Sequence, residues 1–253
     1  MRLVTYEWSG RRRLGAIVGG RVVDLAGMVG HPAFPSTMEA LIARPRGTVL
    51  DAARAALERT DDLDGWTIPN ARLLAPILPP SLSEEEHRWV VGPDEVIQRP
   101  PGNGDARFDL EVAAVIFRPK KPKLRPSDAR GCIFGYTLMQ SWFNHDAFAA
   151  ALGPCVVTAD EFDETAPVTA TVNGRAWSEG LVEEAGADFA TQIVAAARAQ
   201  ELLPGEVFGS GTLGKRNPAR KAPRPGAEIT ISHPSIGTLT NKVAGRMRRR
   251  KAS

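Results

Sequence analysis

Short runs of β-forming residues, each bounded by glycine or proline, occupy most of this chain and restrict it to a fold built on sheets. The predicted strands of the larger part lie at 108–118, 132–139, 153–158, 169–174, 206–212, 228–233 and 237–243. One run of helical periodicity interrupts them at 188–203, with Asp188 as its candidate N-cap and Pro204-Gly205 as its end. This order of short strands and turns is typical of a roll-like or barrel-like β domain.

The N-terminal part has a different pattern. Strand-like runs at 3–8, 15–20 and 21–25 precede helical periodicity at 38–44 and 48–60. A length of 253 residues fits one to two domains at roughly 150 residues each. We therefore predict an α+β protein, whose parts are a small α/β domain (1–70), a β-roll catalytic domain (71–245) and a basic disordered tail (246–253).

Composition excludes several classes of protein. The chain is 43% hydrophobic and 24% charged, as a globular protein is, and it has no apolar run of about eighteen residues that could cross a membrane. Two cysteines provide neither a disulfide framework nor a four-cysteine zinc site, and we expect no secretory signal and a cytoplasmic location. Much of the basic excess behind the net charge of +3 is local, in a loop at 119–126 and in the tail, so we expect no nucleic-acid partner.

The strand predicted at 108–118 carries two acidic residues, Asp109 and Glu111. Because successive side chains of a strand face opposite sides, these two share one face, about 7 Å apart along the backbone. A hard cation such as Mg²⁺, which takes oxygen ligands, would relieve their repulsion. In the alternative, which the spacing alone favours, Asp109 lies at the strand edge and only Glu111 points inward, paired with an arginine.

Polar side chains gather in two further segments. In GYTLMQSWFNHD (135–146) they follow an apolar strand, and His145 beside Asp146 forms either a general base with its orienting carboxylate or a solvated turn. In SLSEEEH (81–87), His87 lies at helical spacing from Glu84 and Ser83, which makes either an acid–base couple or an exposed helical turn. Both segments are candidate sources of a proton-transferring histidine.

A glycine-rich segment, FGSGTLG (208–214), precedes Lys215. Its backbone N–H groups could bind an anion or a carbonyl oxygen, and Lys215 is a candidate cation for a carboxylate or enolate. It matches neither the P-loop nor the Rossmann pattern, so nucleotide binding is not supported.

Taken in order, the motifs of residues 73–243 resemble the fumarylacetoacetate hydrolase family. The segments that carry the resemblance are APILPPSL, GPDEVIQRPPG, DLEVAAVI, IFGYTLMQSW, LGPCVVTADEFD, VNGRAWSEG, PGEVFGSGTLG and PGAEITISHPSIGTLTNKV. Residues 1–70 resemble the small N-terminal domain that part of the family has. The resemblance implies a mixed β-roll catalytic domain, commonly a homodimer. It also implies Mg²⁺- or Ca²⁺-dependent hydrolysis, decarboxylation or isomerisation of β-diketones, acylpyruvates or oxaloacetate-like acids.

The family's site residues carry over only in part. Its E-x-E metal pair falls on Asp109 and Glu111, and Ser141 stands where the family has its next metal-binding aspartate. His145-Asp146 replaces an Arg-Asp pair, and the lysine that usually follows is absent. His87 matches a catalytic histidine, but the aspartate that accompanies it has no counterpart here.

Two carboxylates remain where the family has three or four, so we predict weak or absent Mg²⁺ at Asp109 and Glu111 and no other cofactor. We favour a metal-independent isomerisation, cyclisation or rearrangement of an enolisable β-dicarbonyl molecule in a bacterial biosynthetic pathway, with His87, His145 and the two acids as general acid and base. A Mg²⁺-dependent hydrolase or decarboxylase of diketo acids, and a non-catalytic binding protein, are the alternatives. The candidate substrate-binding residues are Tyr136, Gln140, Ser141, Trp142, Asn144, Thr212 and Lys215.

Overall fold

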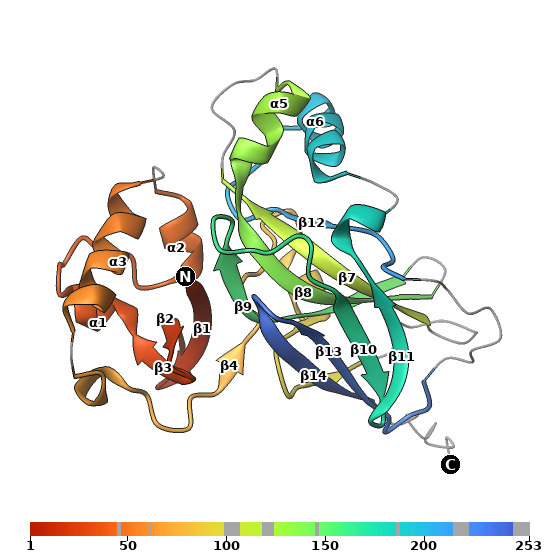
Figure 1. Cartoon of the computed structure of the whole chain (residues 1–253), viewed down its shortest axis with the longest axis horizontal. Helices are drawn as coiled ribbons and strands as arrows, with labels where there is room; N and C mark the ends of the chain where they lie inside the picture. Colours follow the sequence, from red (N-terminus) through yellow and green to blue (C-terminus); the bar gives the residue numbers. More distant parts are fainter. Residues whose placement is uncertain are drawn as a thin grey trace, which may run out of the picture.

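The computed structural model describes residues 1–44, 47–60, 62–98, 107–117, 124–144, 147–185, 188–214 and 223–244. Two open sheets form the framework, and the helices lie at the N-terminal end and beside the C-terminal half (Figure 1). The described strands do not close into a barrel, so the roll-like form of the predicted α+β architecture is the one observed.

The first sheet has nine strands among the described residues, and its main path runs β12-β7-β8-β9-β1-β2-β3. Its strands are β1 (Arg2–Trp8), β2 (Arg11–Val18), β3 (Arg21–Asp24), β4 (Leu73–Leu74), β5 (Val90–Val91), β7 (Arg107–Ile116), β8 (Ile133–Asn144), β9 (Ala147–Thr158) and β12 (Val207–Gly209). The long antiparallel strands β7, β8 and β9 are its centre.

The second sheet has the order β11-β10-β13-β14-β6. Its strands are β6 (Val96–Ile97), β10 (Val168–Val172), β11 (Arg175–Gly180), β13 (Glu228–His233) and β14 (Gly237–Val243). The helices are α1 (Leu25–Val29), α2 (Met38–Ile42), α3 (Thr48–Arg59), α4 (Glu84–His87), α5 (Pro126–Ala129) and α6 (Phe189–Ala199), with 3-10 turns η1 (Asp64–Trp66), η2 (Arg130–Cys132) and η3 (Val182–Glu184). None of the described helices combines the length and the apolar character that a bilayer crossing requires.

Alternation along β7 divides its side chains between two buried layers. Leu110 and Val112 belong to a cluster that also contains Ile229 and Leu239 of the second sheet, so one face of β7 packs on that sheet. Ala113 and Val115 belong instead to the cluster that the N-terminal helices complete. The strand that carries the two predicted acids is therefore buried on both faces.

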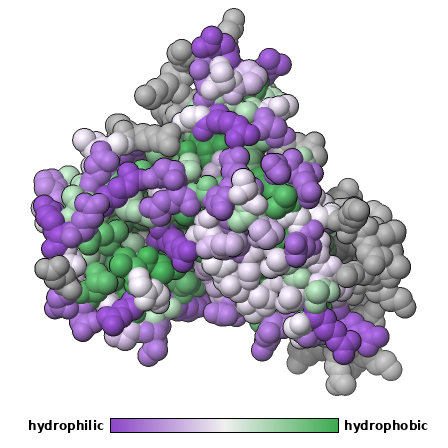
Figure 2. Space-filling model, viewed as in Figure 1, coloured by the Kyte–Doolittle hydropathy of each residue, from purple (hydrophilic) through white to green (hydrophobic). Residues whose placement is uncertain are grey.

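The N-terminal module shares the large sheet. β1 pairs antiparallel with β9 through Arg2 opposite Val157 and Leu3 opposite Val156, and also with β4. The two predicted domains are thus joined by main-chain hydrogen bonds as well as by the chain, and the boundary near residue 70 remains a prediction. Figure 2 shows mostly polar side chains on this face of the molecule, with apolar ones gathered over the N-terminal strands.

The strand between residues 132 and 139 is longer than predicted. β8 continues to Asn144, because β7 pairs with it on one side and β9 on the other as far as its end. The polar run from Gln140 to Asn144, expected at a strand end, therefore lies within the sheet, where alternation sends its side chains to opposite faces. The helix predicted at 188–203 is confirmed over Phe189–Ala199, and Asp188 accepts a hydrogen bond from the Thr191 N–H as its N-cap.

Candidate active site

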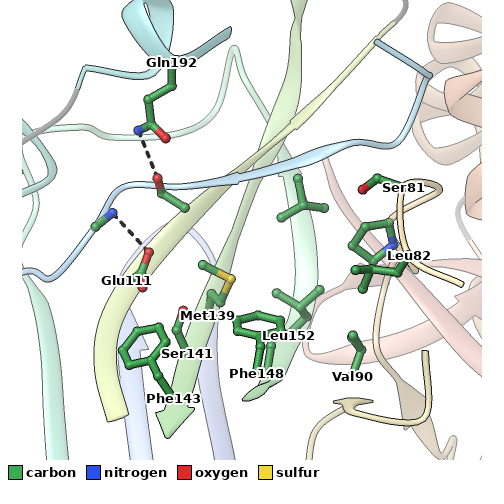
Figure 3. Close-up of a pocket in the computed structure, with 15 residues that line it drawn as sticks. Ser81, Leu82, Val90, Glu111, Met139, Ser141, Phe143, Phe148, Leu152 and Gln192 are labelled. Atoms are coloured by element: carbon green, nitrogen blue, oxygen red, sulfur yellow. Dashed lines mark hydrogen bonds between the residues drawn. The ribbon is translucent and has the colours of Figure 1, made fainter. Parts of the chain in front are cut away.

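A cavity of about 420 Å³ lies on the face of β7, β8 and β9 that is turned away from the second sheet (Figure 3). The segment that leads into β5 and the loop that follows β12 enclose it. The residues that line it are Pro79, Ser81, Leu82, Val90, Glu111, Met139, Ser141, Phe143, Phe148, Ala150, Leu152, Gln192, Val207, Gly209 and Gly211. Among these described residues Glu111 is the sole charged one.

The two carboxylates of β7 lie on one face, as their spacing predicts, and both are buried: Asp109 is 7% exposed and Glu111 6%. The Thr212 hydroxyl donates a hydrogen bond of 2.7 Å to Asp109 Oδ2. The Gly211 N–H donates one of 3.0 Å to Glu111 Oε2. Asp109 is thus not a strand-edge residue, and the loop after β12 supplies contacts to both acids.

Main-chain hydrogen bonds hold this loop, residues 210–213, along the edge of β7. The Ser210 N–H donates to the Val112 carbonyl and the Leu213 N–H to the Leu110 carbonyl, each at 2.8 Å. The Gln192 side-chain amide, from α6, donates to the Gly209 carbonyl at 3.0 Å (Figure 3). These contacts fix the Gly211 N–H where it meets Glu111.

Burial raises the pKa of Glu111 above its ordinary value, and the neighbouring charge of Asp109 raises it further. The Ser141 hydroxyl and the Gly211 N–H oppose this shift by stabilising the ionised form. Ser141 Oγ is fully buried near the carboxyl group, though not at the distance and angle of a regular hydrogen bond with any described residue. The Glu111 carboxyl group therefore remains protonated to a higher pH than a glutamate in water does.

Close packing around the Glu111 carboxyl group makes Gly209→Ala informative. A methyl group at position 209 would overlap Glu111 Oε2 and the Met139 side chain. We expect this substitution to displace the carboxyl group and lower kcat/KM by on the order of tenfold, since small misplacements of a reacting group are costly. Gly65→Ala is the matched control, because a methyl group there meets nothing within 4 Å. Equal steady-state activity of the two variants would contradict the placement of Glu111 in the site.

Three predicted substrate-binding residues lie on the other face of β8. Trp142 is fully buried in the cluster shared with the second sheet, and its ring stacks on Phe108 at 5.3 Å. Gln140 donates to Asn241 at 3.2 Å, and the Tyr136 hydroxyl donates to Glu164 at 3.3 Å. Their even-numbered positions on β8 send these side chains away from the cavity, so they support the sheet packing and do not line this site. Ser141, at an odd position, does line it.

The remaining predicted residues are placed less directly. Thr212 contacts Asp109, as described above. His87 ends α4 and its Nε2 lies 2.9 Å from the Pro79 carbonyl, so it contacts the cavity wall without lining the cavity. Asn144 is the last residue of β8, and the structure does not describe its side chain. His145 and Lys215 lie outside the described residues.

Several residues that line the cavity were not predicted. Met139 and Phe143 follow from strand alternation once β8 is extended, since both lie at odd positions with Ser141. Gln192 and Leu82 come from elements distant in the sequence, and a local pattern does not place them in the site.

A family model described as fumarylacetoacetate (FAA) hydrolase, C-terminal, matches residues 71–244. The chain belongs to the fumarylacetoacetate hydrolase family. This confirms the resemblance inferred from the motifs and the prediction of an enzyme of this superfamily, without fixing the reaction. A comparison with curated proteins gives no match.

Solved structures share the fold over nearly the whole chain. A maleylpyruvate hydrolase from Sphingobium sp. SYK-6, solved with manganese(II) and pyruvate, is 21% identical with a TM-score of 0.76, over 98% of this chain and 100% of that one. A fumarylacetoacetate hydrolase from Exiguobacterium antarcticum is 23% identical with a TM-score of 0.73, over 97% and 100%. A 5-carboxymethyl-2-hydroxymuconate delta-isomerase from Mycobacterium smegmatis is 21% identical with a TM-score of 0.69, over 98% and 100%. Hydrolases and isomerases of this family therefore share the architecture.

The divalent cation that the family resemblance implies does not fit the described residues. Mg²⁺ requires near-octahedral oxygen ligands, of which several are usually waters and the others mostly carboxylates. Asp109 and Glu111 bring two, Ser141 brings a neutral hydroxyl, and within the described part of the chain no three histidine, cysteine or acidic side chains gather to hold a metal ion. One oxygen of each carboxylate already accepts a hydrogen bond from the 211–212 loop. The described residues thus offer a hard cation fewer charged ligands than the three or four carboxylates that the family resemblance implies, which is a poor fit for a tightly held ion.

Proposed function

We propose that this member of the fumarylacetoacetate hydrolase family catalyses proton transfer on an enolisable β-dicarbonyl-type molecule without a resident metal. The reaction class is an isomerisation, cyclisation or related rearrangement, placed in a biosynthetic pathway. The observation that carries the proposal is the buried Glu111 carboxyl group, held by the Gly211 N–H in a cavity that is otherwise uncharged among its described residues. A carboxyl group with a raised pKa is a stronger base than an ordinary carboxylate, which suits it to take and return a proton.

The steps follow from the positions of the groups around Glu111. Its ionised carboxylate takes a proton from the carbon between two carbonyl groups, and the electron pair passes to a carbonyl oxygen to form the enolate. The Ser141 hydroxyl, on the same face of the sheet, can donate a hydrogen bond to that oxygen. The protonated Glu111 then returns the proton to a different atom of the substrate, which completes an isomerisation with no net gain or loss. His87 and His145 remain candidates for a second proton-transferring group.

Metal-dependent hydrolysis or decarboxylation of a diketo acid is the second candidate. The shared face of Asp109 and Glu111 favours it, as does the manganese(II) and pyruvate of the maleylpyruvate hydrolase structure. It requires a ligand set that the described residues do not supply. A binding protein without activity would hold the same ligand unaltered on prolonged incubation. By family resemblance we further infer a homodimer, which light scattering can check.

Calorimetric titration with Mg²⁺ and Mn²⁺ separates the two enzymatic functions. For the metal-free reaction we expect no binding in the micromolar range, because two carboxylates and a hydroxyl leave most ligand positions to water. We also expect substrate turnover to persist in excess chelator. A micromolar dissociation constant that Glu111→Gln abolishes would instead establish the metal-dependent function.

A further inference from the structure

The cavity changes in chemical character from one strand to the next. Its floor is formed by β7, then β8, then β9, which are neighbours in the sheet. In that order the lining side chains of the floor are Glu111 from β7, Met139, Ser141 and Phe143 from β8, and Phe148, Ala150 and Leu152 from β9. The floor therefore runs from a carboxyl group, through a hydroxyl and a thioether, to a purely apolar end.

The far edge of the cavity continues the same division. Leu82 and Val90 border the apolar end, where Val90 of β5 lies opposite Ala150 of the neighbouring strand β9. Figure 3 shows Leu82, Val90 and Leu152 on one side of Met139, with Glu111 and Ser141 on the other. Because neighbouring strands are about 4.8 Å apart, the two ends are separated by roughly 10 Å. This is the length of a molecule with a small polar head and one ring or short alkyl chain.

Charge restricts the head group. Glu111 lines the cavity, and Asp109 lies on the same face of β7 two residues away. An anionic ligand would bring a further negative charge close to these two carboxyl groups, and like charges repel. Among the described lining residues there is no cation to offset that repulsion.

We infer that the substrate is an uncharged carbonyl compound, with its enolisable head over Glu111 on β7 and an aryl or alkyl body over β9. This inference rests on the proposed function and names its substrate class. It would separate this chain from an enzyme for acylpyruvate or oxaloacetate-like acids, whose carboxylates require a cation that the described lining residues do not provide.

A pair of ligands with the same aryl group tests the charge preference. 1-Phenyl-1,3-butanedione is uncharged at neutral pH, and benzoylpyruvate carries a carboxylate in a similar skeleton. We expect calorimetry in the presence of a chelator to give a dissociation constant at least about tenfold lower for the uncharged diketone, from like-charge repulsion. Equal or tighter binding of benzoylpyruvate, or binding of neither compound at millimolar concentration, would overturn the inference.

Two substitutions identify the ends of the cavity. Glu111→Gln removes the charge at nearly constant shape, and we expect it to reduce the preference for the uncharged ligand to less than threefold. Phe148→Ala removes an apolar side chain that is 44% exposed at the cavity edge. It should raise the dissociation constant of the diketone by about five- to tenfold. Val96→Ala is the matched control, since Val96 is 49% exposed outside this cavity and should leave both constants unchanged. Unchanged binding in Phe148→Ala would place the ligand elsewhere.

Product analysis of the same samples tests the proposed function separately. If the protein binds the uncharged diketone and other uncharged compounds of its class but converts none of them, catalysis is refuted, while the preference of the site for uncharged ligands stands. If the protein converts benzoylpyruvate and binds it more tightly than the uncharged diketone, the inferred substrate class is refuted, while the proposal that the protein is an enzyme stands.

Discussion

Glu111→Gln is expected to lower kcat by about 10²- to 10⁴-fold, the range associated with loss of a general acid or base. The amide cannot take a proton from carbon, yet its oxygen can still accept the Gly211 hydrogen bond that the carboxylate accepts now. Steady-state rates with a turned-over diketone, alongside a melting curve, measure the effect. The melting temperature should not fall, because glutamine also removes the repulsion from the Asp109 carboxylate.

The pH dependence of kcat/KM distinguishes a proton-transferring role of Glu111 from a purely structural one, because only the first would change it in the variant. Burial raises the pKa of Glu111, so the ionised form that accepts the proton is lost as pH falls through that raised pKa. We expect kcat/KM of the native enzyme to fall as the pH is lowered, with a midpoint above the ordinary pKa of a glutamate. The pH–rate profile of the variant should lack this acidic limb. Asp109, Ser141 and the Gly211 N–H are the groups that tune it, and among them only Asp109 carries charge.

Glu206→Gln is the matched control for Glu111→Gln, because Glu206 is also a buried glutamate, 6% exposed, but does not line the cavity. It should retain the native rate and the native acidic limb. If both variants lost activity equally, a general effect of removing a buried carboxylate would explain the result, and the assignment to Glu111 would be wrong.

Strand alternation predicts that the two acids share one face, but it leaves open the alternative, favoured by the spacing alone, in which Asp109 lies at the strand edge. Residues 108–118 form a long, largely apolar run typical of a buried strand, and the period of two then puts Asp109 and Glu111 on one face. The register between β7 and β8 then places Ser141 opposite Asp109, on the face that alternation assigns to it. The alternation of side chains between the two faces of a strand follows from local covalent geometry, so it can be predicted from the sequence alone.

The other half of the site depends on contacts between distant segments. The Gly211 N–H reaches Glu111 only because Ser210 and Leu213 pair with the edge of β7, about a hundred residues earlier in the chain. Gln192 is one polar residue of an amphipathic helix, and its contact with Gly209 is set by where α6 docks. Such positions follow from tertiary packing, so a local pattern of residues does not encode them.

Trp142 shows why residue type alone is a weak guide to a binding site. A tryptophan within a polar run suggests a pocket wall, but the register of β8 turns it into the layer between the two sheets, where it is fully buried and stacks on Phe108. Aromatic rings bury a large apolar area in such layers. Its neighbour Ser141, one residue earlier, faces the cavity instead.

Trp142→Ala is therefore expected to destabilise the fold by about 3 to 5 kcal/mol, the usual cost of emptying a large buried aromatic site. For a chain of this size that corresponds to a fall in melting temperature of about 6 to 20 °C. Ligand affinity and the rate per folded molecule should stay within a few-fold at low temperature, because the ring does not line the cavity. Thermal and denaturant unfolding measure the first effect, and calorimetry with 1-phenyl-1,3-butanedione the second.

Two further variants make the Trp142 result decisive. Trp8→Ala is the matched control, because Trp8 is 53% exposed and its loss should change stability by no more than about 0.5 kcal/mol. Trp142→Phe keeps a ring against Phe108 and should give a folded protein with an intermediate loss of stability, should the alanine variant fail to fold. If Trp142→Phe kept the native stability and lost the ligand, the ring would contact substrate after all, and the division of β8 into a packing face and a catalytic face would have to be abandoned.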